Sequence, residues 1–208
     1  LAFLNRFGLG GCLADDMGLG KTIQMIALLQ HERTERPREM IRPTLMVCPM
    51  SVAGNWRREL ERFAPELRVH VQHGPDRPVG DAFAEVAKES DVVVTTYALV
   101  SRDRKWIEEV EWERVVLDEA QHIKNPPTKQ ATAIRSIKSR HRVALTGTPV
   151  ENRLTELWSI MDFCLPGFLG PQGEFRRRFA VPIERHRDEE RGERLKRLVG
   201  PFVLRRLK

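Results

Sequence analysis

The feature that most constrains the fold is an alternation of short apolar runs with longer amphipathic runs along residues 11–145. Two short runs, DVVVTT and RVVLDE, have continuously apolar centres, as strands do when helices cover both faces of a parallel sheet. We predict strands at Gly11–Ala14, Thr44–Cys48, Val69–Gln72, Asp91–Thr95, Val115–Leu117 and Val143–Leu145. We predict helices at Lys21–His31, Val52–Phe63, Val79–Glu89, Ser101–Val110 and Thr128–Lys138. This pattern predicts an α/β fold with three layers and a parallel central sheet.

The alternation stops after Pro149. Helical patterns follow at Asn152–Cys164, Gln172–Phe179 and Asp188–Leu198, without a strand pattern between them. We therefore predict two parts, a lobe over residues 1–150 and a helical protrusion with a return segment over residues 151–208.

Charge and composition narrow the class of protein. The formal net charge is +6, and arginines are dense in FRRRF (175–179) and LRRLK (204–208), which suggests a polyanionic partner. The sequence lacks an apolar run of about 18 residues, and its N-terminal residues do not resemble a signal peptide. Three widely separated cysteines form no disulfide framework. We therefore expect an intracellular protein without a membrane partner.

A glycine-rich stretch, ADDMGLGKT (14–22), lies between the first predicted strand and helix. It ends like a phosphate-binding loop, although Asp15 stands where the strict pattern has its first glycine. We expect Gly18, Leu19 and Gly20 to turn backbone N–H groups toward a polyphosphate. Lys21 would reach the β- and γ-phosphates, and the Thr22 hydroxyl would bind Mg²⁺.

Asp15 and Asp16 raise a separate question, because carboxylates at the entrance of the loop would repel phosphates that they faced. Our hypothesis is that one of them pairs with a nearby arginine or accepts loop N–H groups and so fixes the shape of the loop. The alternative is that both are solvated acids.

The stretch WERVVLDEAQHIKN (112–125) would complete the nucleotide site. An apolar strand that ends in adjacent acids places Asp118 at its carboxyl end, where open α/β sheets bind ligands. Asp118 would hold the metal, and Glu119 would orient and deprotonate the attacking water. A solvated strand end would show the same two acids, but their combination with the glycine-rich loop favours a nucleoside triphosphatase.

Several long motifs now resemble one family, the SWI/SNF-type ATPases of helicase superfamily two, and in particular the bacterial and archaeal members with DEAQ. They are ADDMGLGKTIQ, DEAQHIKN, LTGTPVENRLTELWSIMDF (145–163), VCPMSVAGNWRREL (47–60), VVVTTYALV (92–100) and the Arg-rich residues 175–208. The resemblance spans nearly the whole chain. It implies a RecA-like P-loop NTPase lobe, of which this chain matches the N-terminal one, plus the helical protrusion.

The resemblance also implies residue roles. Lys21, Asp118 and Glu119 keep the roles given above, and Gln121 would sense the γ-phosphate or contact the other lobe. Thr146, Gly147 and Thr148 would couple the nucleotide state to the DNA face. Ser51, Trp56, Thr96 and Tyr97 fall in motifs near the DNA track, with core packing as the alternative for Trp56.

Members of this family use ATP and Mg²⁺ to track along double-stranded DNA and remodel protein–DNA complexes, and they clamp ATP between two lobes. We expect the second lobe, with its arginine fingers, and the adenine-reading segment to be absent from these residues. The fragment alone would then bind ATP weakly and hydrolyse it slowly. A cytoplasmic location, at the nucleoid in a prokaryote, would follow.

Two other functions stay open on the sequence. One is a lobe of an RNA- or single-strand-directed helicase, against which the wording DDMGLGKT and TGTPVEN argues. The other is a non-catalytic module that docks DNA or protein. The intact Lys21, Asp118 and Glu119 argue against it, because a scaffold has no physical need for them.

Overall fold

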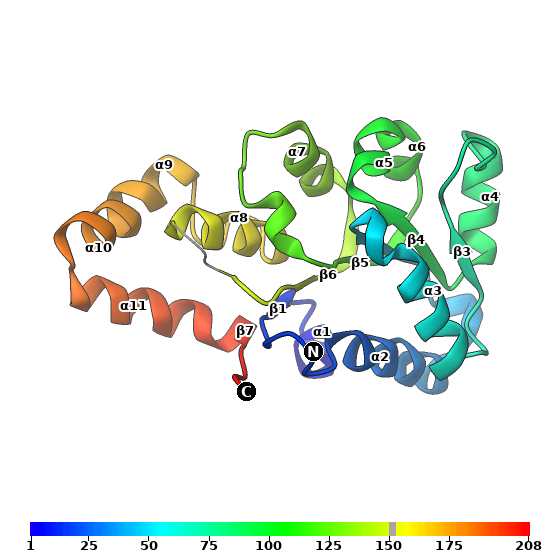
Figure 1. Ribbon diagram of the computed structural model, residues 1–208, viewed down its shortest axis with the longest axis horizontal. Coiled ribbons are helices and arrows are strands. Elements are labelled where there is room, and N and C mark those ends of the chain that lie inside the picture. The colour runs from blue at the N-terminus through cyan, green and yellow to red at the C-terminus, as the bar shows by residue number, and fades with distance from the viewer. Residues whose placement is uncertain (150–152) are drawn as a thin grey trace.

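The computed structural model describes residues 1–149 and 153–208. Its strands form one all-parallel sheet in the order β3-β4-β2-β5-β6-β1-β7 (Figure 1). They are β1 (Gly11–Leu13), β2 (Thr44–Cys48), β3 (Val69–Val71), β4 (Val92–Thr96), β5 (Trp112–Leu117), β6 (Ser139–Leu145) and β7 (Val203–Leu204). The predicted α/β class with a parallel central sheet is confirmed.

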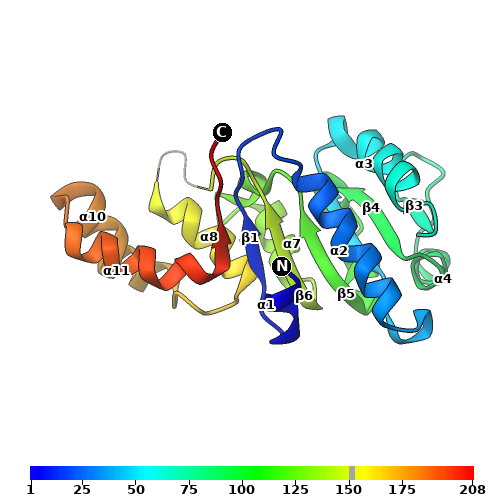
Figure 2. The ribbon, with the colours of Figure 1, turned by 90° about the horizontal axis from the view of Figure 1, so that it is seen from below.

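Helices cover both faces of the sheet, so the lobe has three layers (Figures 1 and 2). The helices are α1 (Ala2–Arg6), α2 (Lys21–Glu35), α3 (Met50–Phe63), α4 (Asp81–Glu89), α5 (Tyr97–Arg102), α6 (Arg104–Glu109), α7 (Lys129–Ser136), α8 (Leu154–Cys164), α9 (Gln172–Phe175), α10 (Val181–His186) and α11 (Glu189–Val199). Successive side chains of β2 alternate between the layers. Leu45 and Val47 pack with α4–α8, whereas Met46 and Cys48 pack with α2 and α3. Each described helix is too short or too polar to cross a lipid bilayer.

Strand β5 begins at Trp112 rather than at Val115, because the structure buries the two charged residues between them. Glu113 is 1% exposed and pairs with Arg36 (Nη2–Oε1 3.0 Å). Arg114 is fully buried and donates to both oxygens of Glu32, at 2.6 and 2.9 Å. Charged side chains are rarely buried unless they are paired. The sequence shows the charges but not their partners on other elements.

The helical pattern predicted at Ser101–Val110 forms two short helices, and the first begins earlier than expected. Thr96 caps α5, since its Oγ1 accepts the Leu99 N–H at 3.3 Å, so that α5 follows β4 directly. The buried Asp103 separates α5 from α6 and receives two hydrogen bonds from Arg77, at 2.7 and 2.8 Å.

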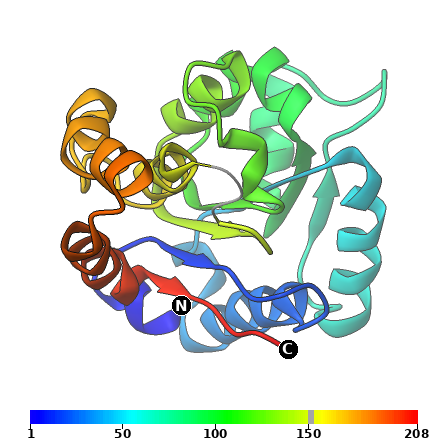
Figure 3. The same cartoon turned by 60° about the vertical axis from the view of Figure 1, so that its left-hand side comes forward.

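The helices after residue 153 share a small apolar core of their own beside the sheet (Figure 3). Helix α8 contributes to both cores: Ile160 and Phe163 pack under the sheet, while Leu157 and Trp158 face the smaller cluster. The other members of that cluster include Met161, Phe175, Phe179, Leu195 and Val199. The predicted start of a helix at Asn152 lies outside the described residues. The division of the chain at residue 150 stays a prediction.

The return segment, residues 203–208, begins with strand β7, which the sequence analysis did not predict. It pairs in parallel with β1, with Cys12 opposite Val203 and Leu13 opposite Leu204. Figures 2 and 3 show the red C-terminal segment beside the blue strand β1 and the loop that follows it. A strand of two residues is too short to give a periodic signal in the sequence.

Candidate nucleotide site

The glycine-rich loop lies between β1 and α2, as predicted. Gly18 (φ +84°) and Gly20 (φ +74°) adopt left-handed backbone conformations that favour glycine. Gly20 is also the N-cap of α2, and among the described residues no side chain caps this end. The first N–H groups of the helix, together with its positive dipole end, therefore suit an anion.

Lys21 is the first residue of α2, and its side chain folds back over the loop. Its Nζ donates to the carbonyl oxygens of Asp15 (2.6 Å) and Asp16 (3.4 Å). An ammonium group has three N–H donors, so one remains for a phosphate oxygen. Thr22 follows in the first turn of the helix and is partly buried.

The question about the two acids has an answer in the structure. Asp15 is fully buried, and its carboxylate accepts hydrogen bonds from the backbone N–H of Arg206 (2.9 Å) and from the Arg206 guanidinium. These bonds hold the pKa of Asp15 below its usual value. Asp16 accepts the backbone N–H of Lys208 at 3.2 Å. The predicted pairing of one of these acids with an arginine is confirmed, and the effect of the pair on the shape of the loop stays a hypothesis.

The second half of the site lies at the carboxyl end of β5, separated from β1 in the sheet by β6. Asp118 accepts hydrogen bonds from the Trp56 indole N–H (2.7 Å, to Oδ2) and from the Glu119 backbone N–H (3.0 Å, to Oδ1). Burial raises the pKa of Asp118, and the charge of Glu119 adds to this, while the Trp56 bond and the Lys21 ammonium lower it. Strands β1 and β5 both pair with β6 in parallel, so the two halves of the site lie at the same end of the sheet.

A cation would suit this environment. Because burial and Glu119 disfavour the charge on Asp118, a divalent cation beside it would be stabilising. The described part of the chain offers no group of three His, Cys, Asp or Glu side chains able to form a complete metal site. Mg²⁺ is usually held by one or two protein oxygens together with substrate phosphates. The oxygens of Asp118 and Thr22 fit that arrangement.

Glu119 has a backbone conformation that is unusual for its residue type. Its φ of +51° lies in the left-handed region, which side chains other than glycine adopt at a cost. Such conformations cluster at functional sites, where surrounding contacts hold them. One contact here is the Tyr97 hydroxyl, which donates to the carbonyl oxygens of Asp118 (2.8 Å) and Glu119 (3.4 Å).

A chain of hydrogen bonds joins Glu119 to the loop after β6. Gln121 donates from Nε2 to Glu119 Oε2 (2.8 Å), and its Oε1 accepts the Thr146 hydroxyl (2.9 Å). Thr146 Oγ1 in turn accepts the Thr148 backbone N–H at 3.1 Å. Gly147 lies against the phosphate loop, since a Cβ atom there would be 3.6 Å from Met17 Cγ. The structure thus brings together the residues predicted for catalysis and for coupling.

The residues predicted near the DNA track divide into two groups. Trp56 (1% exposed) and Tyr97 (4% exposed) are buried, and their polar atoms bind Asp118. Their burial leaves no ring surface for a direct contact with DNA, so core packing, the alternative for Trp56, describes both. Ser51 is exposed at the start of α3, and Thr96 is the buried cap of α5.

The sequence analysis missed two residues that help to hold the phosphate loop, Gln24 and Arg206. Gln24 donates to the Leu19 carbonyl (3.1 Å) and to Asp15 (3.4 Å). Arg206 binds both Asp15 and Gln24, the latter at 2.8 Å. Gln24 comes one helical turn after Lys21, so its spacing could have placed it beside the loop. The sequence has no signal for Arg206, because 191 residues separate it from Asp15.

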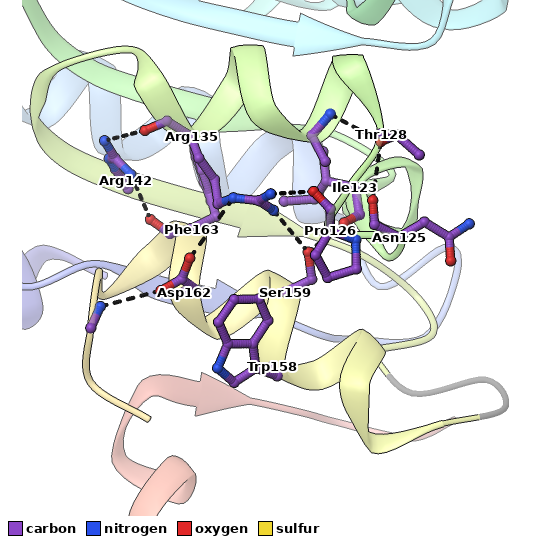
Figure 4. Close-up of polar contacts among 12 residues, drawn as sticks. Ile123, Asn125, Pro126, Thr128, Arg135, Arg142, Trp158, Ser159, Asp162 and Phe163 are labelled. Atoms are coloured by element: carbon purple, nitrogen blue, oxygen red, sulfur yellow. Dashed lines mark hydrogen bonds and ion pairs between the residues drawn. The ribbon is translucent and has the colours of Figure 1, made fainter. Parts of the chain in front are cut away.

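A further network fastens the segment after Glu119 to α8 (Figure 4). Arg135 binds the Pro126 carbonyl, the Ser159 hydroxyl (3.2 Å) and, through Nε, the Asp162 carboxylate (3.8 Å). The buried Ser159 hydroxyl donates to the Ile123 carbonyl. The loop that carries Gln121 is therefore anchored to the first helix of the C-terminal segment.

The chain is similar in sequence to several known proteins. A family model described as "SNF2-related domain" matches residues 2–208. The "Putative ATP-dependent helicase/translocase YwqA" of Bacillus subtilis is 53% identical over 208 residues, which are 100% of this chain and 22% of that protein. The "TATA-binding protein-associated factor mot1" of Schizosaccharomyces pombe is 41% identical over 228 residues, again 100% of this chain but 12% of that protein.

Solved structures show the same similarity. The "Sulfolobus solfataricus SWI2/SNF2 ATPase core in complex with dsDNA" superimposes with a TM-score of 0.88 at 46% identity, over 99% of this chain and 42% of that chain. The "Sulfolobus solfataricus SWI2/SNF2 ATPase core domain" gives a TM-score of 0.85, also at 46% identity, over 98% of this chain and 40% of that chain. This chain thus spans less than half of either structure.

Proposed function

This chain belongs to the SNF2-related domain family, and on that premise we propose that it is the first ATPase lobe of a double-stranded-DNA translocase. The observation that carries the proposal is the placement of a phosphate loop and two carboxylates at the carboxyl ends of β1 and β5, which both pair with β6. A second RecA-like lobe outside these residues would complete the site. The partial coverage of the Sulfolobus ATPase core supports this.

Each residue of the site has a defined task in ATP hydrolysis. Gly18, Leu19 and Gly20 orient backbone N–H groups, and Lys21 donates to the β- and γ-phosphates. Thr22 and Asp118 would hold Mg²⁺, which would offset the negative charge on the phosphates. Glu119 accepts a proton from the attacking water. Residues 1–208 alone would bind ATP weakly and react slowly, because an arginine finger from another part of a protein typically contributes about 10³–10⁵ in rate.

Coupling between nucleotide and DNA would use the chain from Glu119 through Gln121 to Thr146, Gly147 and Thr148. A γ-phosphate that accepted a hydrogen bond from the Gln121 amide would change the hydrogen bonds available to Thr146, since Gln121 bonds both Glu119 and Thr146. The loop after β6 would then transmit the presence of the phosphate toward the DNA face.

Double-stranded DNA is the proposed polymer. A Sulfolobus relative of known structure is described as bound to double-stranded DNA, and the net charge of +6 favours a polyanion. Ser51 remains the proposed DNA-facing residue, whereas Thr96 is buried as the cap of α5. The names of the relatives, a helicase/translocase and a TATA-binding protein-associated factor, support the remodelling of protein–DNA complexes. A cytoplasmic location at the nucleoid forms part of the same proposal.

The test is ATP hydrolysis by the full-length protein without nucleic acid, with duplex DNA, with single-stranded DNA and with RNA. We expect stimulation chiefly by duplex DNA, lost in Lys21→Ala and in Glu119→Gln and retained in the control Lys88→Ala, which changes an exposed lysine of α4. Stimulation chiefly by RNA or single strands would instead indicate a strand-directed helicase. Absence of hydrolysis in every condition would overturn the ATPase proposal in favour of a docking module.

A further inference from the structure

The return segment runs alongside the phosphate loop well beyond strand β7. After the paired residues of β1, the Ala14 N–H donates to the Leu204 carbonyl (2.7 Å), and the Asp16 N–H donates to the Arg206 carbonyl (3.1 Å). The Lys208 side chain reaches Gly18, where a Cβ atom would lie 3.0 Å from its Nζ. Residues 203–208 therefore border the loop from its start to its first glycine.

Arg206 makes the central contact of this border. Its guanidinium binds both oxygens of Asp15 and the side-chain oxygen of Gln24, and its backbone N–H binds Asp15 as well. Asp15 is fully buried, and an unpaired buried carboxylate is costly. Arg206 therefore compensates the buried charge of Asp15 in this conformation of the loop.

The same residue, Asp15, also holds Lys21. The peptide carbonyl of Asp15 accepts the Lys21 ammonium at 2.6 Å, while its carboxylate is held by Arg206. Gln24 makes a parallel connection, because it binds Arg206 through Oε1 and the Leu19 carbonyl through Nε2. Arg206 is thus connected to the start of the loop through Asp15 and to Leu19 near its end through Gln24.

From this geometry we propose that Arg206 is a positioning residue for ATP binding, which acts through Asp15 on Lys21 and through Gln24 on Leu19. The return segment then couples the helices of residues 153–202 to the nucleotide. The coupling is reciprocal: a displacement of the segment lowers ATP affinity, and bound ATP stabilises the segment. This inference rests on the proposed ATP site.

A second ion pair provides the control that separates an effect on the position of the phosphate loop from a general loss of protein stability. Arg36 pairs with Glu113 much as Arg206 pairs with Asp15: the arginine side chains are 37% and 52% exposed, and the acids 1% and 0%. Glu113 lies near the amino end of β5, at the opposite edge of the sheet from Asp118. Arg36→Ala therefore removes an arginine from a buried acid far from the loop, where Arg140 remains 3.4 Å from Glu113.

ATP affinity would be measured in the full-length protein by titration with a fluorescent ATP analogue and Mg²⁺, and the melting temperature by calorimetry. We expect Arg206→Ala to weaken binding by about tenfold or more, as the loss of outer partners does at metal sites. Arg206→Lys, which keeps the charge but not the two-pronged donor, should give an intermediate loss. Arg36→Ala should lower the melting temperature and leave ATP affinity unchanged.

Hydrogen exchange on the unaltered protein tests the reciprocal effect without any variant that has to fold. ATP with Mg²⁺ should slow the exchange of backbone amides in residues 203–208. Unchanged ATP affinity in Arg206→Ala, an equal loss in Arg36→Ala, or unchanged exchange in residues 203–208 would overturn the inference while the ATP site stands. If the unaltered protein bound no ATP, the proposed function would fail and this inference with it.

Discussion

The hydrogen bond between Trp56 and Asp118 gives a prediction whose size can be worked out. The bond is 2.7 Å long, its acceptor is a carboxylate, and the indole is 1% exposed. A hydrogen bond to a charged group contributes about 1.5–3 kcal/mol to the free energy of unfolding. Trp56→Phe removes the donor, but it also leaves a void, because the phenyl ring is smaller than indole. A single variant therefore overstates the bond.

A double-mutant cycle removes that ambiguity. Urea unfolding would be followed for the unaltered protein, Trp56→Phe, Asp118→Ala and the double variant. The void appears in both arms of the cycle and cancels, so the sum of the two single losses should exceed the loss in the double variant by about 1.5–3 kcal/mol. Losses that add to within about 0.5 kcal/mol would refute the reasoning.

The same variant has a consequence for activity. The Trp56 bond lowers the pKa of Asp118 against the effect of burial, so Trp56→Phe should let that pKa rise. Asp118 would then become protonated at a higher pH and lose its charge for Mg²⁺. We expect the acid limb of the pH profile of kcat/KM for ATP to move to higher pH. An unmoved acid limb would show that another group controls it.

Three other predictions follow from single contacts. Gln121→Ala breaks the bridge to Thr146, and it should reduce DNA-stimulated kcat by about tenfold while leaving KM for ATP unchanged in steady-state assays. Burial and Arg114 hold the pKa of His141 below its ordinary 6.5. The neutral ring therefore stabilises the folded protein fully above about pH 6.5, and this contribution declines as the pH falls toward the pKa of the folded state. His141→Gln should therefore flatten the fall in unfolding free energy between about pH 7 and pH 5 in urea titrations. Ser159→Ala leaves a buried carbonyl unpaired and should cost about 1–3 kcal/mol in the same measurement, whereas an unchanged midpoint would show that water replaces the hydroxyl.

The sequence predicted the central strands because each contains a continuous apolar run. Strand β2 has the predicted bounds, and every one of its residues is buried. The loop could likewise be placed, because Gly18, Gly20 and Lys21 adjoin one another in the chain. Local patterns of this kind depend on neighbouring residues only, and they survive without knowledge of the fold.

Contacts between distant residues could not be predicted in the same way. The start of β5 was missed because the partners that allow Glu113 and Arg114 to be buried lie on α2 and just after it. The sequence analysis expected Asp15 or Asp16 to bind some arginine, but it could not choose Arg206 among the many arginines of the chain. From the sequence, Trp56 could either contact DNA or pack in the core, and its bond to Asp118 became visible only in the folded structure.

The pairing of β7 with β1 also sets an order of events during synthesis. Asp15 is synthesised before its partner Arg206, which follows 191 positions later in the chain. At about 5–20 residues per second, that interval lasts roughly 10–40 s. Throughout it the outer edge of β1 lacks its neighbour, and an unpaired strand edge invites association with other chains. The nucleotide loop thus leaves the ribosome well before the arginine that completes its contacts has been made.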